Sequence, residues 1–326
     1  MVAGHMSLKL GKHLIERLKK NPGTFYTARE IATWIFEIYP QECAAKKANS
    51  TNNRLQTDNE LLLQIAAEIG SQIPRLQKNN PYLKSTEGRP RRYYWSEQNA
   101  EQEVTEVEKR GINVLPSSDN PTTNNDSTHH RLTEQQLYPL LSQYLFQTLS
   151  IYSMRIDEKR SSNKAGNGGN EWLHPDLVGM EDLTKNWTRE IKECVGVLTE
   201  RRAQLWSFEV KLLINRSNVR KSYFQTVSNS SWAHFGYLVA AVIEGEDTLK
   251  ELNLLAAAHG IGVIELNTAS PTDSQILIPA REHAELNWDT CNRLAEENTD
   301  FINFLARVRR FYQTGEVIFS EWGIKR

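Results

Sequence analysis

The stretch WSFEVKLLI, from Trp206 to Ile214, places a glutamate and a lysine inside a run that is otherwise typical of a buried strand. Successive side chains of a strand point to opposite faces of its sheet. Glu209 and Lys211 therefore share one face, and the other face carries Phe208, Val210 and Leu212. Upstream, the fragment WLHPDLVG places Asp176 among apolar neighbours in a similar way. The sequence predicts that these three charged residues serve a common site.

Residues of these types suit phosphoryl-transfer chemistry. Two carboxylates at neighbouring strand ends can share Mg²⁺, a cation that prefers oxygen ligands and keeps several of its waters. The metal ion activates one of these waters as a nucleophile. A lysine on the same face can orient or deprotonate the water, or neutralise charge on the phosphoryl group. We expect Asp176 and Glu209 to bind the metal ion, with the main-chain carbonyl of Val210 as a further ligand and Lys211 beside the attacking water.

The Glu-x-Lys motif is weak by itself, because a chain with 40 acidic and 39 basic residues contains such triplets by chance. The triplet Glu190–Lys192 lies in a helical pattern, where residues two apart do not face each other. The triplet Asp157–Lys159 ends a predicted strand, but no acid precedes it in a comparable strand. For Glu209 and Lys211, the alternative interpretation is an exposed cross-strand ion pair. The order of the surrounding elements favours a catalytic site.

These elements define a predicted C-terminal domain over residues 131–326. A helix after Thr133 is followed by a strand, a strand that begins near Asp176, the strand of Glu209, a helix and another strand. Two of the strands are continuous apolar runs joined by a helix, which is typical of a sheet covered on both faces. A helical insertion is expected around Trp187–Thr199, and one long amphipathic helix over Trp288–Tyr312. We predict an α/β (α+β) domain with a mixed central sheet.

Residues 7–97 form a predicted DNA-binding domain. The pattern indicates three helices, the third from Asn59 to Leu76, and then a basic hairpin with its turn at Glu87–Gly88. Residues 1–97 contain 15 Lys and Arg against 9 Asp and Glu, a net charge of +6. This order of elements is typical of a winged helix-turn-helix, whose third helix can enter the major groove while its wing contacts phosphates.

The residues expected to contact DNA lie on the exposed face of the third helix, in the wing, and just after the strand of Glu209. They are Gln64, Glu68, Ser71, Gln72, Arg75, Lys84, Arg89, Arg91, Arg92, Arg216, Arg220 and Lys221. The alternative for the wing is that its arginines only protect a hairpin edge. The last three basic residues are equally compatible with an ordinary charged surface.

The segment between these domains, residues 98–130, is rich in Ser, Thr, Asn, Pro and acids and has little to bury. It is predicted to be a flexible polar linker. The three cysteines, which are far apart in the sequence, indicate neither a disulfide framework nor a zinc site. No apolar run reaches the roughly 20 residues that a membrane span needs. We expect a cytoplasmic protein that does not associate with membranes.

The fragments HPD, His174–Asp176, and FEVK, Phe208–Lys211, resemble the motif of PD-(D/E)XK nucleases, in the branch of restriction endonucleases and Mrr-like enzymes. The resemblance covers residues 131–326. With the basic winged helix in front, the whole chain is similar to HrgA-like proteins associated with restriction systems. The resemblance implies that Asp176 and Glu209 bind the metal ion and that Lys211 serves the attacking water. It also makes Glu134, in the first helix, a candidate acid, although a glutamate there equally suits the helix dipole.

These inferences predict a Mg²⁺-dependent endonuclease of a restriction or modification-dependent restriction type, acting on double-stranded DNA. Mn²⁺ is expected to replace Mg²⁺, and no organic cofactor is expected. Cutting both strands requires two active sites, which favours a homodimer on DNA. The alternative is a DNA-binding regulator with an inactive nuclease-like domain. A third hypothesis is a repair or RNA-directed nuclease, in which Tyr93, Tyr94 and Trp95 could stack on single strands.

Overall fold

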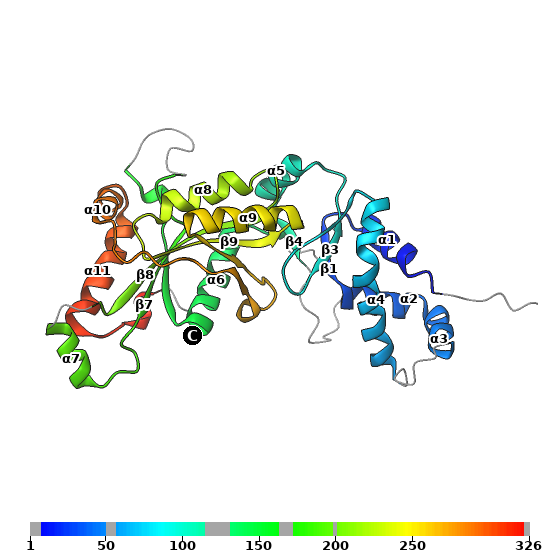
Figure 1. Cartoon of the computed structure of the whole chain (residues 1–326), viewed down its shortest axis with the longest axis horizontal. Coiled ribbons are helices and arrows are strands. Elements are labelled where there is room, and N and C mark those ends of the chain that lie inside the picture. The colour runs from blue at the N-terminus through cyan, green and yellow to red at the C-terminus, as the bar shows by residue number, and fades with distance from the viewer. Residues whose placement is uncertain (1–7, 50–56, 115–130, 163–171, 198–200, 323–326) are drawn as a thin grey trace, which may run out of the picture. The chain divides into compact units, whose positions relative to one another are not determined.

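The structure is a computed structural model that describes residues 8–49, 57–114, 131–162, 172–197 and 201–322. The chain divides into two compact units, an N-terminal unit of residues 1–103 and 112–131 and a C-terminal unit of residues 104–111 and 132–326. Each unit combines helices with a sheet that contains both parallel and antiparallel strand pairs (Figure 1). The predicted α/β class is confirmed.

The helices of the N-terminal unit are α1 (Leu10–Lys20), α2 (Ala28–Ile38), α3 (Pro40–Ala48) and α4 (Asp58–Asn79). Capping boxes formed by Thr27 with Glu30 and by Thr57 with Glu60 fix where α2 and α4 begin. Apolar side chains at helical spacing pack together between these helices, including Leu14, Leu18, Ile31, Ile35, Ile65 and Ile69. Helix α3 was not predicted. Its polar sequence contains the buried Cys43, which packs into the same core.

The sheet of the N-terminal unit has the order β2-β3-β1-β4-β5. Its strands are β1 (Thr24–Thr27), β2 (Leu83–Ser85), β3 (Arg92–Trp95), β4 (Ile112–Val114) and β5 (Arg131–Leu132). Strands β2 and β3 form the predicted antiparallel hairpin, and β1 pairs with β3 on its other side. The aromatic residues Tyr93, Tyr94 and Trp95 of this hairpin are buried.

The prediction of a flexible linker over residues 98–130 is wrong for its first part. Residues Ala100–Arg110 form helix α5, and β4 pairs in parallel with β1. The buried residues Val104 and Ile112 anchor this segment, although its composition is mostly polar. Acids in the first turn of α5 and bases in the last also suit the helix dipole. The later residues, 115–130, lie outside the described residues.

The C-terminal unit is built around a six-stranded sheet with the order β11-β10-β9-β8-β7-β6. The strands are β6 (Ile151–Arg155), β7 (Leu177–Asp182), β8 (Ala203–Ile214), β9 (Phe235–Ile243), β10 (Gly262–Glu265) and β11 (Gln275–Ile278). Strands β6, β7 and β8 are antiparallel neighbours, whereas β8, β9 and β10 run parallel. The predicted mixed sheet is confirmed, and β11, which was not predicted, closes one edge.

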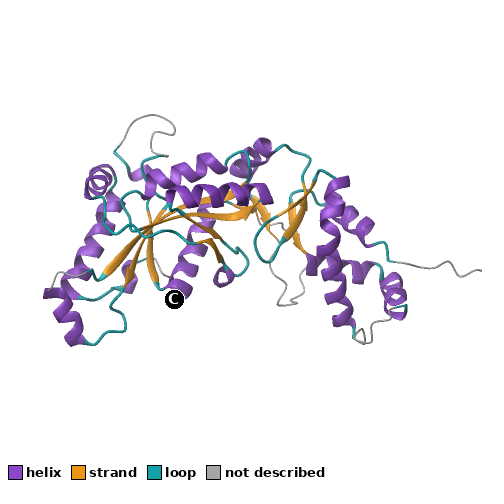
Figure 2. Cartoon of the chain, viewed as in Figure 1, coloured by secondary structure: helices purple, strands orange, loops and turns teal. Residues whose placement is uncertain are grey.

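Helices cover both faces of this sheet. Figure 2 shows α6 (Glu134–Leu149) on one side and α8 (Val219–Ser230) with α9 (Glu246–His259) on the other. Strand β9 is buried along almost its whole length because it lies between these layers. The predicted helical insertion is present as α7 (Arg189–Val197). Short 3₁₀ turns occur at η1 (Glu158–Arg160), η2 (Pro271–Asp273) and η3 (Phe319–Glu321).

The prediction of one long C-terminal helix is wrong. The segment forms two helices, α10 (Trp288–Glu297) and α11 (Thr299–Thr314), separated by Asn298. The Asn298 backbone is extended, and its side chain accepts hydrogen bonds from the N–H groups of Asp300 and Phe301. This asparagine caps the second helix and thereby ends the first. No helix in the described part of the chain is both long enough and apolar enough to cross a membrane.

Candidate active site

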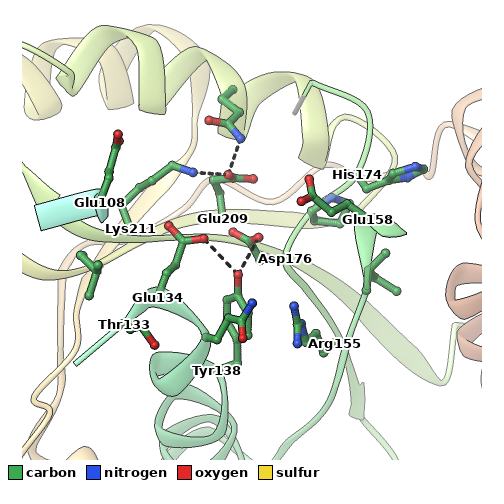
Figure 3. Close-up of a pocket in the computed structure, with 15 residues that line it drawn as sticks. Glu108, Thr133, Glu134, Tyr138, Arg155, Glu158, His174, Asp176, Glu209 and Lys211 are labelled. Carbon is green, nitrogen blue, oxygen red and sulfur yellow. Dashed lines mark hydrogen bonds and ion pairs between the residues drawn. The ribbon is translucent and has the colours of Figure 1, made fainter. Parts of the chain in front are cut away.

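The four predicted catalytic side chains of the C-terminal unit, Glu134, Asp176, Glu209 and Lys211, meet in one open cavity of about 550 Å³. Asp176 immediately precedes β7, and Glu209 and Lys211 lie in the neighbouring strand β8. The antiparallel register pairs Leu177 with Phe208 and so places Asp176 beside Glu209. Glu134 enters the cavity from the first turn of α6. Figure 3 shows that these four side chains point toward one another.

The Asp176 carboxylate is fixed by its neighbours on two sides. The backbone N–H of Val210 donates a hydrogen bond of 2.7 Å to Asp176 Oδ2. The Tyr138 hydroxyl lies 3.2 Å from Asp176 Oδ1. The Asp176 backbone donates to the carbonyl of Phe208 at 3.1 Å, which continues the ladder between β7 and β8. The strands of Asp176 and Glu209 are therefore direct neighbours, although a helical insertion separates them in the sequence.

Glu209 is the most buried carboxylate of the site, with 2% of its surface exposed. Lys211 Nζ lies 2.7 Å from Glu209 Oε1, so the two charges share a face, as predicted. Helix α8 supplies two further donors, Gln225 Nε2 at 2.5 Å from Oε1 and Asn229 Nδ2 at 2.9 Å from Oε2. The interpretation as an exposed cross-strand ion pair is wrong, because the pair is enclosed between β8 and α8.

Glu134 joins the site through Tyr138, which lies one turn later on α6. The Tyr138 hydroxyl is 3.1 Å from Glu134 Oε1 and also contacts Asp176. Because a hydroxyl has one proton, it can donate to only one of the two carboxylates at a time. The other carboxylate must then share a proton or a cation, or face the hydroxyl oxygen unfavourably. The hydroxyl therefore links two of the acidic groups of the cavity.

The three carboxylates resist ionisation. Burial raises the pKa of Glu209 to about 8, and the charge of Asp176 adds to this shift. Burial and the charge of Asp176 likewise raise the pKa of Glu134 to about 7. Burial also raises the pKa of Asp176, against the opposing effect of Lys211. Desolvation and mutual repulsion penalise the ionised forms, so the cluster favours binding of protons or of an added cation.

Lys211 is the one cation in direct contact with this cluster among the described residues. Burial alone would lower its pKa, but the charges of Glu209, Asp176 and Glu134 outweigh burial and raise the pKa of Lys211. The side chain is therefore an ammonium group at neutral pH. Its charge compensates only part of the negative charge that three ionised carboxylates would carry.

The oxygen atoms of the cavity suit a partly hydrated Mg²⁺, which usually takes one or two protein carboxylates and keeps several waters. Asp176 and Glu209 offer two carboxylates. The N–H of Val210 is directed at Asp176, and the carbonyl of the same residue lies along the same strand edge. Within the described ranges, no group of three or more His, Cys, Asp or Glu side chains is arranged as a metal site.

Sequence reasoning missed the residues that support this cluster, Tyr138, Gln225 and Asn229. Gln225 and Asn229 are four residues apart and thus lie on one face of α8, directed at the strand of Glu209. Two amides at this spacing after the strand could have indicated a helix that holds a buried carboxylate. Of the rival triplets, Glu190–Lys192 lies in α7, as expected, whereas Glu158 of the other triplet lines the same cavity.

The residues of α4 that are predicted to contact DNA differ in their exposure. Ser71 and Arg75 are exposed, and Gln72 is half-buried. Gln64 and Glu68 are half-buried: Lys46 of α3 forms an ion pair of 2.8 Å with Glu68, and Gln64 donates a hydrogen bond of 2.9 Å to Glu68. The presence of α3, which was not predicted, explains this difference.

The remaining predicted DNA contacts differ in exposure. In the hairpin loop, Arg89 and Arg91 are exposed, and Arg91 lies 3.3 Å from Glu87. Lys84 forms an ion pair with the buried Glu103 instead of extending into solvent, and Arg92 is half-buried. The three basic residues after β8, Arg216, Arg220 and Lys221, are exposed and lie outside the cavity of Asp176. Arg220 forms an ion pair of 2.6 Å with Glu251.

Comparisons with known proteins add little. No protein family matches the sequence, and no curated protein matches it. Among solved structures, the chain is similar to the SPO1766 protein of unknown function from Silicibacter pomeroyi, with 15% sequence identity and a TM-score of 0.29. The similarity covers 57% of this chain and 96% of that one. At this TM-score, the likeness carries no argument about fold or function.

The raised carboxyl pKa values predict that the metal-free protein loses stability as the pH rises from 6.5 to 8. In the unfolded chain, Glu209 ionises near its ordinary pKa of 4.5, whereas in the folded chain its pKa is about 8. The folded state therefore binds more protons in this window, and each such carboxyl costs at most about 1.4 kcal/mol per pH unit. Urea unfolding in EDTA measures this dependence.

The variant Glu209→Gln should flatten this pH dependence, because it removes one of the responsible groups. The exposed Glu316→Gln serves as the control and should leave the slope unchanged. Burial lowers the pKa values of His174 and His234. These histidines therefore change the free energy of unfolding mainly below pH 6.5, outside the pH range in which wild type and Glu209→Gln are compared. Equal slopes for wild type and Glu209→Gln would contradict the assignment.

Proposed function

We propose that the chain is a Mg²⁺-dependent DNA endonuclease of a restriction or modification-dependent restriction type. The N-terminal unit selects the DNA site, and the C-terminal unit hydrolyses the phosphodiester bond. The observation that carries this proposal is the meeting of Glu134, Asp176, Glu209 and Lys211 in one open cavity. These residues come from three elements that are separated in the sequence, so a chance ion pair does not account for their convergence.

In this proposal each group of the cavity has a distinct role. Asp176 and Glu209 would hold Mg²⁺ together with the Val210 carbonyl, and the ion would supply an activated water and neutralise charge on the phosphate. The Lys211 ammonium orients the attacking water and stabilises the negative charge that develops on the phosphoryl oxygens. Glu134 accepts a hydrogen bond from Tyr138 and adds an acid at the mouth of the cavity.

The element order of each unit supports the corresponding fold proposal. In the N-terminal unit, α1, β1, α2 and α4 precede the β2–β3 hairpin, and β3 pairs between β2 and β1, as in a winged helix. In the C-terminal unit, a helix and an antiparallel strand precede the strands of Asp176 and Glu209, and the parallel strand β9 follows, as in a PD-(D/E)XK nuclease. A homodimer on DNA would supply one such site for each strand.

A DNA-binding regulator with an inactive nuclease-like domain is the second candidate. One observation favours it: both oxygens of Glu209 already accept hydrogen bonds, from Lys211, Gln225 and Asn229. Metal binding would have to replace or share these contacts. The third hypothesis, recognition of single strands by stacking, loses its support because Tyr93, Tyr94 and Trp95 are buried.

A cleavage assay separates the two candidates. We expect the purified protein with Mg²⁺ to cut plasmid DNA from only one of two hosts, one methylating and one non-methylating. Lys211→Met should lower the rate at least about 100-fold, because it removes a group that stabilises the transition state. The matched control is Lys192→Met in the chance triplet of α7, which should cleave as wild type does. DNA binding by the wild-type protein without nicking of either plasmid would favour the regulator.

Substitutions in the N-terminal unit are expected to change the affinity for DNA without involving the candidate active site. Arg75 of α4 and Arg89 of the hairpin loop are exposed, and each is expected to contact a phosphate. Arg75→Ala or Arg89→Ala should reduce the slope of log K against log salt by about one, as measured by fluorescence anisotropy with duplex DNA. The control is Arg189→Ala in α7, where the arginine pairs with Glu193 at 2.7 Å. Slopes equal to that of the control would exclude these contacts.

A further inference from the structure

Arg155, at the end of β6, lies beside the carboxylate cluster but was not among the predicted site residues. Its backbone pairs with that of Leu177, the residue after Asp176. The next residue, Ile156, donates a backbone hydrogen bond of 2.9 Å to the carbonyl of Asp176. The Arg155 side chain is exposed and lines the cavity of the candidate active site (Figure 3).

The guanidinium group of Arg155 lies over the ring of Tyr138. Its Cζ atom lies 4.7 Å from the centroid of the Tyr138 ring, within the range of a cation–π interaction. A cation–π contact with the ring does not use the N–H groups of the guanidinium as hydrogen-bond donors, so these donors stay available to a ligand. Tyr138 thus serves as a platform at its ring and contacts Glu134 and Asp176 through its hydroxyl.

Arg155 makes no ion pair with any residue in the described ranges, although carboxylates surround it. Lys211 differs, because it is bound to Glu209 at 2.7 Å. An arginine whose only role was to neutralise Asp176 would be expected to form a salt bridge with it. The cavity is therefore lined by one cation that is bound to a carboxylate and by one exposed cation that makes no ion pair with the described residues.

We propose that Arg155 binds a phosphate group of the DNA strand that is being cut, with Tyr138 as its platform. This inference rests on the proposed nuclease function. A guanidinium group matches phosphate because it can donate two parallel hydrogen bonds to two oxygens of the same group. Arg155 is a substrate-contacting residue that orients the strand over Asp176, opposite the charge of Lys211.

The test compares Arg155→Met and Arg155→Lys with Arg201→Met in the full-length protein. Arg201 is a suitable control because its guanidinium group already pairs with Glu282 outside the cavity. One readout is the salt dependence of binding to a short duplex with Ca²⁺ in place of Mg²⁺. The other is the division of the cleavage defect between kcat and KM with Mg²⁺.

For Arg155→Met we expect the slope of log K against log salt to fall by about one and KM to rise about tenfold, because one phosphate contact is lost. Arg155→Lys should keep the salt slope but lower kcat, since it retains the charge and loses the planar pair of donors. Thermal unfolding should be the same for all three variants, because these side chains are exposed or only partly buried.

The outcomes separate this inference from the proposed function. If the wild-type protein cleaves DNA and Arg155→Met behaves as Arg201→Met does in both readouts, Arg155 contacts no phosphate and the inference is wrong. If the wild-type protein binds DNA without cleaving it, the nuclease proposal fails, and a lower salt slope for Arg155→Met would still establish the phosphate contact. Equal slopes in that case would refute both.

Discussion

The hydrogen bonds to the buried carboxylate of Glu209 are the interactions on which the rest of the C-terminal unit depends. Burying an ionised carboxylate costs much free energy unless it gains hydrogen-bond or ion-pair partners in the protein. Removing one partner of a buried ion pair destabilises the fold, because the other charge stays buried and unpaired. Here β8 supplies Lys211, and α8 supplies Gln225 and Asn229. Asn229 also donates a hydrogen bond of 2.9 Å to the carbonyl of His174, two residues before Asp176. The Asn229 side chain thus connects helix α8 with strand β8 and with the segment that precedes β7.

This arrangement stores electrostatic repulsion at a defined place. Glu134 and Asp176 share one hydroxyl, Glu209 lies beside them, and a single ammonium group balances part of their charge. Such a cluster is poorly suited to stabilise the fold alone, because well-packed apolar residues of similar size would often do so better. It is well suited to attract a divalent cation and then an anionic substrate. Arg155 adds a second positive charge to the lining of the cavity.

The sequence predicted the centre of this site because strand alternation placed Glu209 and Lys211 on one face and the element order placed Asp176 next to them. It did not predict Gln225 and Asn229, because their four-residue spacing places two amides on one face of a helix but does not by itself show that this face covers the strand of Glu209. The polar composition of residues 98–130 concealed Val104 and Ile112, which anchor a helix and a strand. Glu68 was assigned to the exposed face of α4 because α3, whose Lys46 pairs with it, was not recognised. Local sequence patterns thus predicted single elements, whereas contacts between elements that are distant in the sequence could not be predicted from them.

The proposed nuclease activity requires that Asp176 and Glu209 form a site for a divalent cation. Titration of the purified protein with Mn²⁺, followed by electron paramagnetic resonance, tests this claim without requiring cleavage or DNA. The account predicts that wild type binds Mn²⁺ and that Asp176→Asn or Glu209→Gln loses at least one bound ion per chain, whereas the exposed Asp273→Asn retains all of them. Unchanged binding in the two site variants, or no binding by the wild-type protein, would contradict it.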